Sequence, residues 1–118
     1  MSDPTSTEPA EVVDVDALAD ELLARAREDL QHKASHLVVK GERQRAVLMT
    51  ILAGGGLSEH ASPAAATLHV LRGRVRLYAG DEAEWFLSAG QLVAIPPDRH
   101  AVDAIEDSVI LLTVVLGS

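Results

Sequence analysis

The side chains best suited to chemistry in this chain are its histidines. The chain contains no cysteine, which removes disulfides, thiolate nucleophiles and cysteine-ligated zinc or iron–sulfur sites. It also lacks a GxxxxGK phosphate loop and the GxGxxG, HExxH and GxSxG motifs. Imidazoles that bind a metal or a small anion, or that transfer protons, are the chemistry left to consider. The five candidates are His32, His36, His60, His69 and His100.

Three of these histidines have ordinary structural interpretations. His32 and His36 are four residues apart, a spacing that would suit a metal only on a continuous helix. The run 37–39 (LVV) favours a strand, so we do not expect a ligand pair there. Strand alternation places His69 on an outer face, as a surface or interface histidine.

The N-terminal part predicts a tail and one amphipathic helix. Residues 1–13 are rich in Pro, Ser, Thr and Glu, and we expect a disordered acidic tail. Over residues 14–31 apolar residues recur every three or four positions, which indicates one helical face. Asp14 or Asp16 can cap the start of this helix. We expect its apolar face to pack on the chain's own barrel, with a subunit contact as the alternative.

The remainder, residues 32–118, predicts strands. Strand-like runs of about ten-residue spacing without intervening helices favour an all-β antiparallel sandwich or barrel. The runs 45–53 and 108–115 are apolar on both faces and are expected to be central strands. The three glycines 54–56 predict a turn that leads into a strand carrying His60. The other strands are predicted at 35–40, 65–71, 74–79, 84–88, 91–95 and 100–104.

Composition excludes several classes of function. The chain of 118 residues fits one domain, and its net charge of −8 is concentrated in residues 1–30, which hold nine of the 18 acidic residues. Without a basic stripe, and with three aromatic residues, nucleic acid binding is not expected. No run approaches the roughly 18 apolar residues of a membrane span. No secretory signal is visible, and we expect a cytoplasmic protein without membrane attachment.

Residues Gly54 to Val115 resemble the cupin superfamily, in particular small single-domain bacterial cupins of unassigned function. The first cupin motif is matched by Gly54–Gly56, His60, Pro63 and Gly73, and the second by Gly90, Pro96 and His100. Asp98 stands in place of a motif glycine, and the second histidine arrives one residue early. The resemblance implies a cupin-type jelly-roll β-barrel preceded by the N-terminal helix.

The resemblance also implies a metal ligand set, which this chain has in part. Metal-binding cupins are expected to use two histidines and a glutamate of the first motif and the histidine of the second. His60 and His100 match, but Ser62 and Ala66 occupy the other two positions. Such a site is degenerate, so we expect no cofactor, or at most a weakly bound divalent iron, manganese, nickel or zinc ion.

We therefore expect a cupin that binds or senses a small molecule and has no assigned reaction. The alternative is a metal-dependent oxygenase or isomerase that uses His60 and His100, so whether the chain is an enzyme stays open. A third hypothesis is a structural or protein-interaction role that uses the acidic N-terminal part as the contact. The apolar lining is expected from Leu68, Val70, Val75, Leu77, Leu92, Ile95 and Val102, and the ligand-binding residues are His60, His100, Ser62, Leu68, Val70 and Ile95.

A homodimer is the expected assembly. Small cupins resembling this chain pair through a sheet edge or by strand exchange, and an exposed edge needs covering. The contact is expected at the N-terminal helix or at the strand over 35–40.

Overall fold

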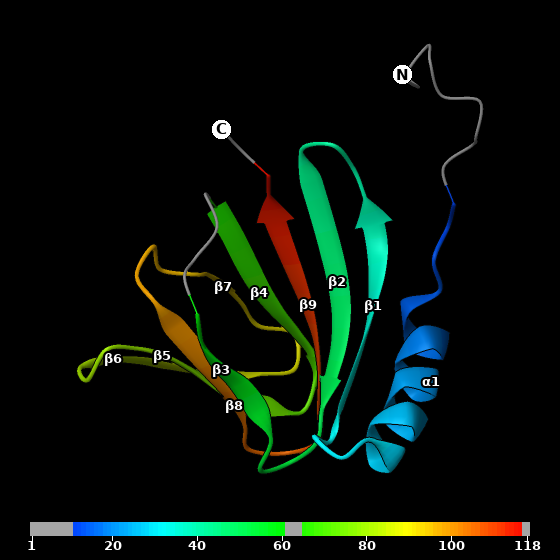
Figure 1. The fold of residues 1–118 in the computed structure, drawn as a ribbon, viewed down its shortest axis with the longest axis horizontal. Coiled ribbons are helices and arrows are strands. Elements are labelled where there is room, and N and C mark those ends of the chain that lie inside the picture. Colours follow the sequence, from blue (N-terminus) through cyan, green and yellow to red (C-terminus); the bar gives the residue numbers. More distant parts are fainter. Residues whose placement is uncertain (1–10, 61–64, 117–118) are drawn as a thin grey trace.

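The computed structural model describes residues 11–60 and 65–116, and for residues 59 and 60 it describes the backbone. The predicted tail over 1–13 therefore lies mostly outside the described residues. In the described part the chain forms one helix and nine strands (Figure 1). They are α1 (Val15–Glu28), β1 (Lys33–Lys40), β2 (Gln44–Ile51), β3 (Gly56–His60), β4 (Ala65–Arg72), β5 (Arg74–Ala79), β6 (Ala83–Ser88), β7 (Leu92–Ala94), β8 (His100–Ala104) and β9 (Ser108–Val115).

The strands form two antiparallel sheets. One sheet has five strands in the order β1-β2-β9-β4-β7, and the other has four in the order β3-β8-β5-β6. The predicted central strands are confirmed, because β2 and β9 both have hydrogen-bonded neighbours on each side. The expected strand containing His60 is also present as β3.

The core lies between the two sheets. Strand alternation sends one side-chain set of each strand into this interior, where apolar burial stabilises the fold. Ile51, Leu68, Val70, Leu77 and Ile110 are completely buried there. Val75, Leu87, Val102 and Ala104 complete this cluster, and Met49, Leu57, Val93, Ile95 and Leu112 pack against it while partly buried.

The two sheets do not close into a barrel. No hydrogen-bonded strand pair joins β1 to β3 or β6 to β7 in the described residues, so the sandwich has two open sides. β7 has only three residues, and Pro96 and Pro97 follow soon after it. Because proline has no N–H to donate, it cannot extend this strand pairing. The all-β expectation with one helix is confirmed, whereas the closed barrel is not seen.

Helix α1 covers the outer face of the five-stranded sheet. Asp14 caps it as predicted, its carboxylate accepting a hydrogen bond from Ala17 N at 3.1 Å. The buried Ala19 and Leu22 pack against Leu48 of β2 and Val109 of β9. This confirms that the apolar helical face packs on the chain's own sheet. In the part of the chain that the structure describes, no helix has the length and apolar character to cross a membrane.

Candidate functional site

Among the histidines whose side chains the structure describes, His100 is the buried one. It begins β8 with 2% of its surface exposed, soon after the bend at Pro97 and Asp98. Alternation along β8 puts His100 on the same face as Val102 and Ala104, which belong to the core between the sheets. Its Nδ1 donates to the Asp98 carbonyl oxygen at 3.1 Å.

His60 occupies the register position opposite His100. The two Cα atoms are partners in the antiparallel β3–β8 pair, and an irregularity in the pairing lies between Leu57 and His60. The predicted site residue Ser62 lies outside the described residues. The backbone thus brings together the two histidines that 40 residues of sequence separate.

The described residues do not fit the metal site of metal-binding cupins. Ala66, at the position of the motif glutamate, is 8% exposed and has only a methyl group. It is in phase with Leu68 and Val70, so that methyl group faces the core. No group of three histidine, cysteine or acidic side chains that could hold a metal occurs within residues 11–58 and 65–116. Two imidazoles without a carboxylate make an incomplete donor set.

The other residues predicted to line the interior mostly contribute to the core between the sheets. Leu68 and Val70 are completely buried in the core, and Ile95 is partly buried against it. Leu92 is the exception, with 62% of its surface exposed. It pairs with His69 on the outer face of the sheet, and its neighbour Val93 packs against the core instead. The expectation that Leu92 lines the interior is wrong, because Val93 and Ile95 face the core and alternation then turns Leu92 outward.

The remaining histidines lie away from His100. Helix α1 ends at Glu28, and His32 follows in a turn with a positive φ of 58°. His36 is exposed on β1, so His32 and His36 do not share a helical face. His69 is half-buried on β4 with Leu92 and Leu111 as register partners, which agrees with the predicted outer position.

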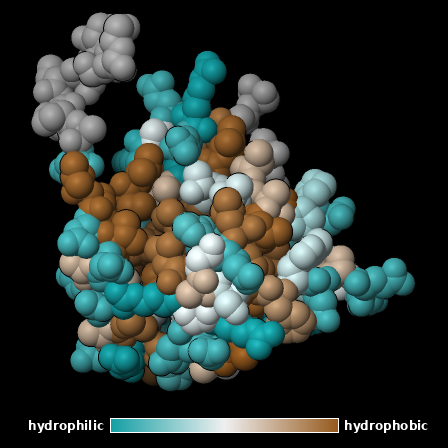
Figure 2. All heavy atoms as spheres, turned by 180° about the vertical axis from the view of Figure 1, so that it is seen from behind, coloured by the Kyte–Doolittle hydropathy of each residue, from teal (hydrophilic) through white to brown (hydrophobic). Residues whose placement is uncertain are grey.

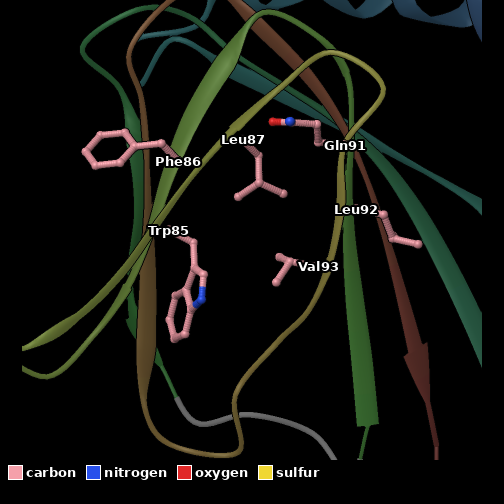
Figure 3. Close-up of a pocket in the computed structure, with 6 residues that line it drawn as sticks. All are labelled: Trp85, Phe86, Leu87, Gln91, Leu92 and Val93. Atoms are coloured by element: carbon pink, nitrogen blue, oxygen red, sulfur yellow. The ribbon is translucent and has the colours of Figure 1, made fainter.

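A hollow of about 330 Å³ marks the open side between β6 and β7 (Figure 3). Trp85, Leu87 and Val93 extend into the space between the two strands, while Phe86 and Leu92 point away from it. The Gln91 side chain accepts a hydrogen bond from Ser88 N at 2.7 Å through Oε1, which fixes its orientation. Trp85 is 36% exposed and is the single tryptophan of the chain. The sequence analysis did not single out Trp85, although alternation along the strand puts it on the same face as Leu87.

Two further hollows lie on the other open side, next to β1 and β3. Their volumes are about 410 and 340 Å³, and both are lined by Lys33, Met49 and Leu57. Arg25, Ala34 and Ser35 complete the first, and Ser58 and Leu112 complete the second. Both open sides of the sandwich are therefore hollowed. Sequence reasoning did not single out this side.

The comparison with protein families decides the classification. The sequence profile of the cupin domain matches residues 47–116, which is more than half of the chain. This chain belongs to the cupin family. No protein among the curated ones matches it.

Solved structures similar to this cupin agree with the fold. A conserved protein of unknown function from Streptococcus pyogenes has a TM-score of 0.70 and 23% identity, covering 100% of this chain and 97% of the other. A cupin superfamily protein from Desulfitobacterium hafniense has a TM-score of 0.67 and 16% identity, with 72% and 78% covered. KdgF from a Halomonas species has a TM-score of 0.65 and 17% identity, with 76% and 84% covered.

Proposed function

We propose that this cupin binds or senses a small molecule in the interior between its sheets, through a degenerate metal site. The observation that carries the proposal is His100, an imidazole with 2% exposure on the inner face of a largely apolar sandwich. Most small-molecule sites are apolar with a few polar groups that fix the ligand. The imidazole of His100 is proposed as one of these polar groups.

The proposed site extends to the neighbouring residues. His60 is proposed as the second polar group, since its Cα atom is the register partner of the His100 Cα atom in the β3–β8 pair. Ser62 is proposed to add a hydroxyl. Leu68 and Val70 are proposed as the apolar floor and Ile95 as a side wall, consistent with their burial. The jelly-roll arrangement that would enclose this ligand is part of the same proposal.

A thermal-shift screen tests this proposal with paired variants. The wild-type protein, His100→Gln and the outer-face control His69→Gln are screened against a set of neutral and anionic metabolites of low molecular weight. We expect compounds that raise Tm for the wild type and His69→Gln but not for His100→Gln. Compounds that raise Tm equally in all three proteins would place binding away from His100. A screen without any active compound would contradict the binding function and favour a role in protein interaction.

The second candidate is a metal-dependent oxygenase or isomerase. The observation in its favour is the register of His60 and His100, which sets two potential nitrogen ligands on adjacent strands. Elemental analysis of protein grown with iron, manganese, nickel and zinc distinguishes the two candidates. We expect metal far below one equivalent, unchanged in His60→Ala. A near-stoichiometric metal that is lost in His60→Ala would overturn the binding proposal in favour of the enzyme.

A homodimer in the cytoplasm completes the proposal. β1 is an edge strand, and its Leu37 and Val39 are 38% and 45% exposed. Hydrophobic side chains also gather on the rear face toward the side of α1 and β1 (Figure 2). An exposed apolar edge favours pairing with a second copy. Light scattering should give a dimer for the wild type and a monomer for Val39→Lys; a wild-type monomer would contradict this assembly.

A further inference from the structure

The open side between β1 and β3 combines an apolar floor with cationic groups. The two hollows there share Lys33, Met49 and Leu57, so they form one continuous groove. Met49 and Leu57, together with Leu112, pack against the core and form the apolar part of this groove. None of its described lining residues is acidic, in a protein whose net charge is −8.

The ammonium group of Lys33 supplies one positive charge to the groove. Its Nζ donates to the Gly56 carbonyl oxygen at 3.5 Å, so the side chain reaches from the edge of one sheet to the edge of the other. This long hydrogen bond uses one of three ammonium protons, which leaves two donors for a bound molecule. Lys33 is half-buried, where an ion pair is less screened than at a fully exposed site.

Arg25 adds a second cation from the last turn of α1. Arg72 and Arg76, by contrast, are ion-paired with nearby carboxylates. Within the described residues, neither Arg25 nor Lys33 lies within ion-pair distance of a carboxylate. The groove thus holds two positive charges that form no ion pair with a described acidic side chain.

We propose that this groove binds a small carboxylate with an apolar body, such as a medium-chain or aryl carboxylate. The carboxylate would accept charge-assisted hydrogen bonds from Lys33 and Arg25, and the apolar body would lie on Met49, Leu57 and Leu112. Hollows of 340 and 410 Å³ fall within the usual range for small-molecule sites. This site does not include His100 and is independent of the interior binding proposed above.

Isothermal titration with matched probes tests the groove. The probes are decanoate and 4-phenylbutyrate, with the neutral 1-decanol as a comparison. We expect both carboxylates to bind the wild type and decanoate to bind roughly tenfold more tightly than decanol, as charge-assisted hydrogen bonds predict. Added salt should weaken decanoate binding and leave decanol binding nearly unchanged.

Charge variants separate this groove from general electrostatics. Lys33→Gln should weaken decanoate binding roughly tenfold without changing decanol binding, and Arg25→Gln should weaken it by a smaller factor because Arg25 is exposed. Lys33→Arg, which keeps the charge, should retain most of the affinity. Lys40→Gln removes one charge from the other end of β1 and should have no effect.

Three outcomes would overturn this inference. They are failure of both carboxylates to bind, equal affinity for decanoate and decanol, and equal losses in Lys33→Gln and Lys40→Gln. His100→Gln distinguishes the two proposals, since decanoate should bind it as it binds the wild type. Loss of decanoate binding in His100→Gln but not in Lys33→Gln would assign the ligand to the interior site instead.

Discussion

Arg72 Nη1 donates to Asp20 Oδ1 at 2.8 Å and thereby joins the end of β4 to helix α1, which lies 52 residues earlier. Its Nη2 also reaches Asp16 Oδ1 and the Asp16 carbonyl oxygen, both at 3.2 Å. The hydrogen bonds with Asp20 and then Asp16 raise the pKa of the Arg72 guanidinium above its usual value. One side chain therefore secures the first turns of the helix to the sheet.

Replacing Arg72 should loosen the helix from the sheet. We expect Arg72→Gln to lower the free energy of unfolding by about 0.5–1 kcal/mol, because solvent screens these exposed partners. Arg45→Gln, an exposed arginine of β2 without an ion pair among the described residues, should cost almost nothing. Urea denaturation of both variants measures the difference. An equal effect of the two substitutions would contradict a specific role of Arg72.

The stabilisation by Arg72 should not vary between pH 7 and 10. A raised pKa in the folded state gives stability that is present in full below the unfolded-state pKa and is lost as the pH rises through the folded-state pKa. For an arginine both values lie far above pH 10. The Tm difference between wild type and Arg72→Gln should therefore be constant across this range. A difference that shrinks steadily toward pH 10 would point to another titrating group.

Gly73 should be much less replaceable than Gly80. Both have a positive φ, 84° and 64° respectively, and a side chain is strained at either position. A Cβ on Gly73 would also collide with the Asp107 carbonyl oxygen and with Ser108, whereas a Cβ on Gly80 would meet nothing within 4 Å. We expect Gly80→Ala to cost about 1 kcal/mol and Gly73→Ala about 2–4 kcal/mol, measured by urea denaturation. Similar losses of stability in Gly73→Ala and Gly80→Ala would contradict a steric collision at Gly73.

Removal of two buried hydroxyl groups should affect stability differently. Thr50 Oγ1 is buried and has no hydrogen-bond partner among the described residues. Ser108 Oγ accepts from Arg74 N at 3.1 Å and lies 3.1 and 2.8 Å from the carbonyl oxygens of Arg74 and Glu106. Thr50→Val should leave stability unchanged or raise it by about 1 kcal/mol. Ser108→Ala should lower it by about 1–3 kcal/mol. Thermal unfolding compares the stability of the two variants. A clear loss of stability in Thr50→Val would show that the Thr50 hydroxyl does form a hydrogen bond.

Substitutions at two adjacent residues of β7 can show which of them faces the core. Leu92 is exposed on the outer face, whereas Val93 packs against the core. We expect Leu92→Ser to change the free energy of unfolding by less than about 0.5 kcal/mol and Val93→Ser to lower it by about 1–2 kcal/mol. The reverse order of losses in urea denaturation would show that Leu92 faces the interior.

Most of the fold could be predicted from sequence because its signals are local. The alternation over 74–79 and the apolar runs at 45–53 and 108–115 reflect burial on one or both faces. The phase of β7 could not be predicted, since a strand of three residues contains too little alternation to fix it. Whether the sandwich closes depends on hydrogen bonding between the edge strands of the two sheets, and local sequence periodicity does not predict this.

The candidate site was only partly accessible to sequence reasoning. His60 and His100 were singled out by the cupin resemblance, and the register opposes their Cα atoms. Lys33 was missed because its role comes from reaching Gly56 on another sheet, 23 residues away. Trp85 was missed because strand alternation alone does not show that the edge beside it is open. Hollows between sheet edges arise from tertiary packing rather than from periodicity.

The central place of β9 constrains how this protein folds during synthesis. Ser108–Val115 pairs with β2 on one side and β4 on the other, so neither strand finds that neighbour until β9 has been made. Gln44 pairs with Val115, which lies 71 residues later in the sequence, and closing so long a loop is entropically costly. A nascent chain that stops before β9 exposes the facing edges of β2 and β4, both rich in apolar side chains. Truncation there should yield an aggregation-prone chain rather than a smaller folded domain.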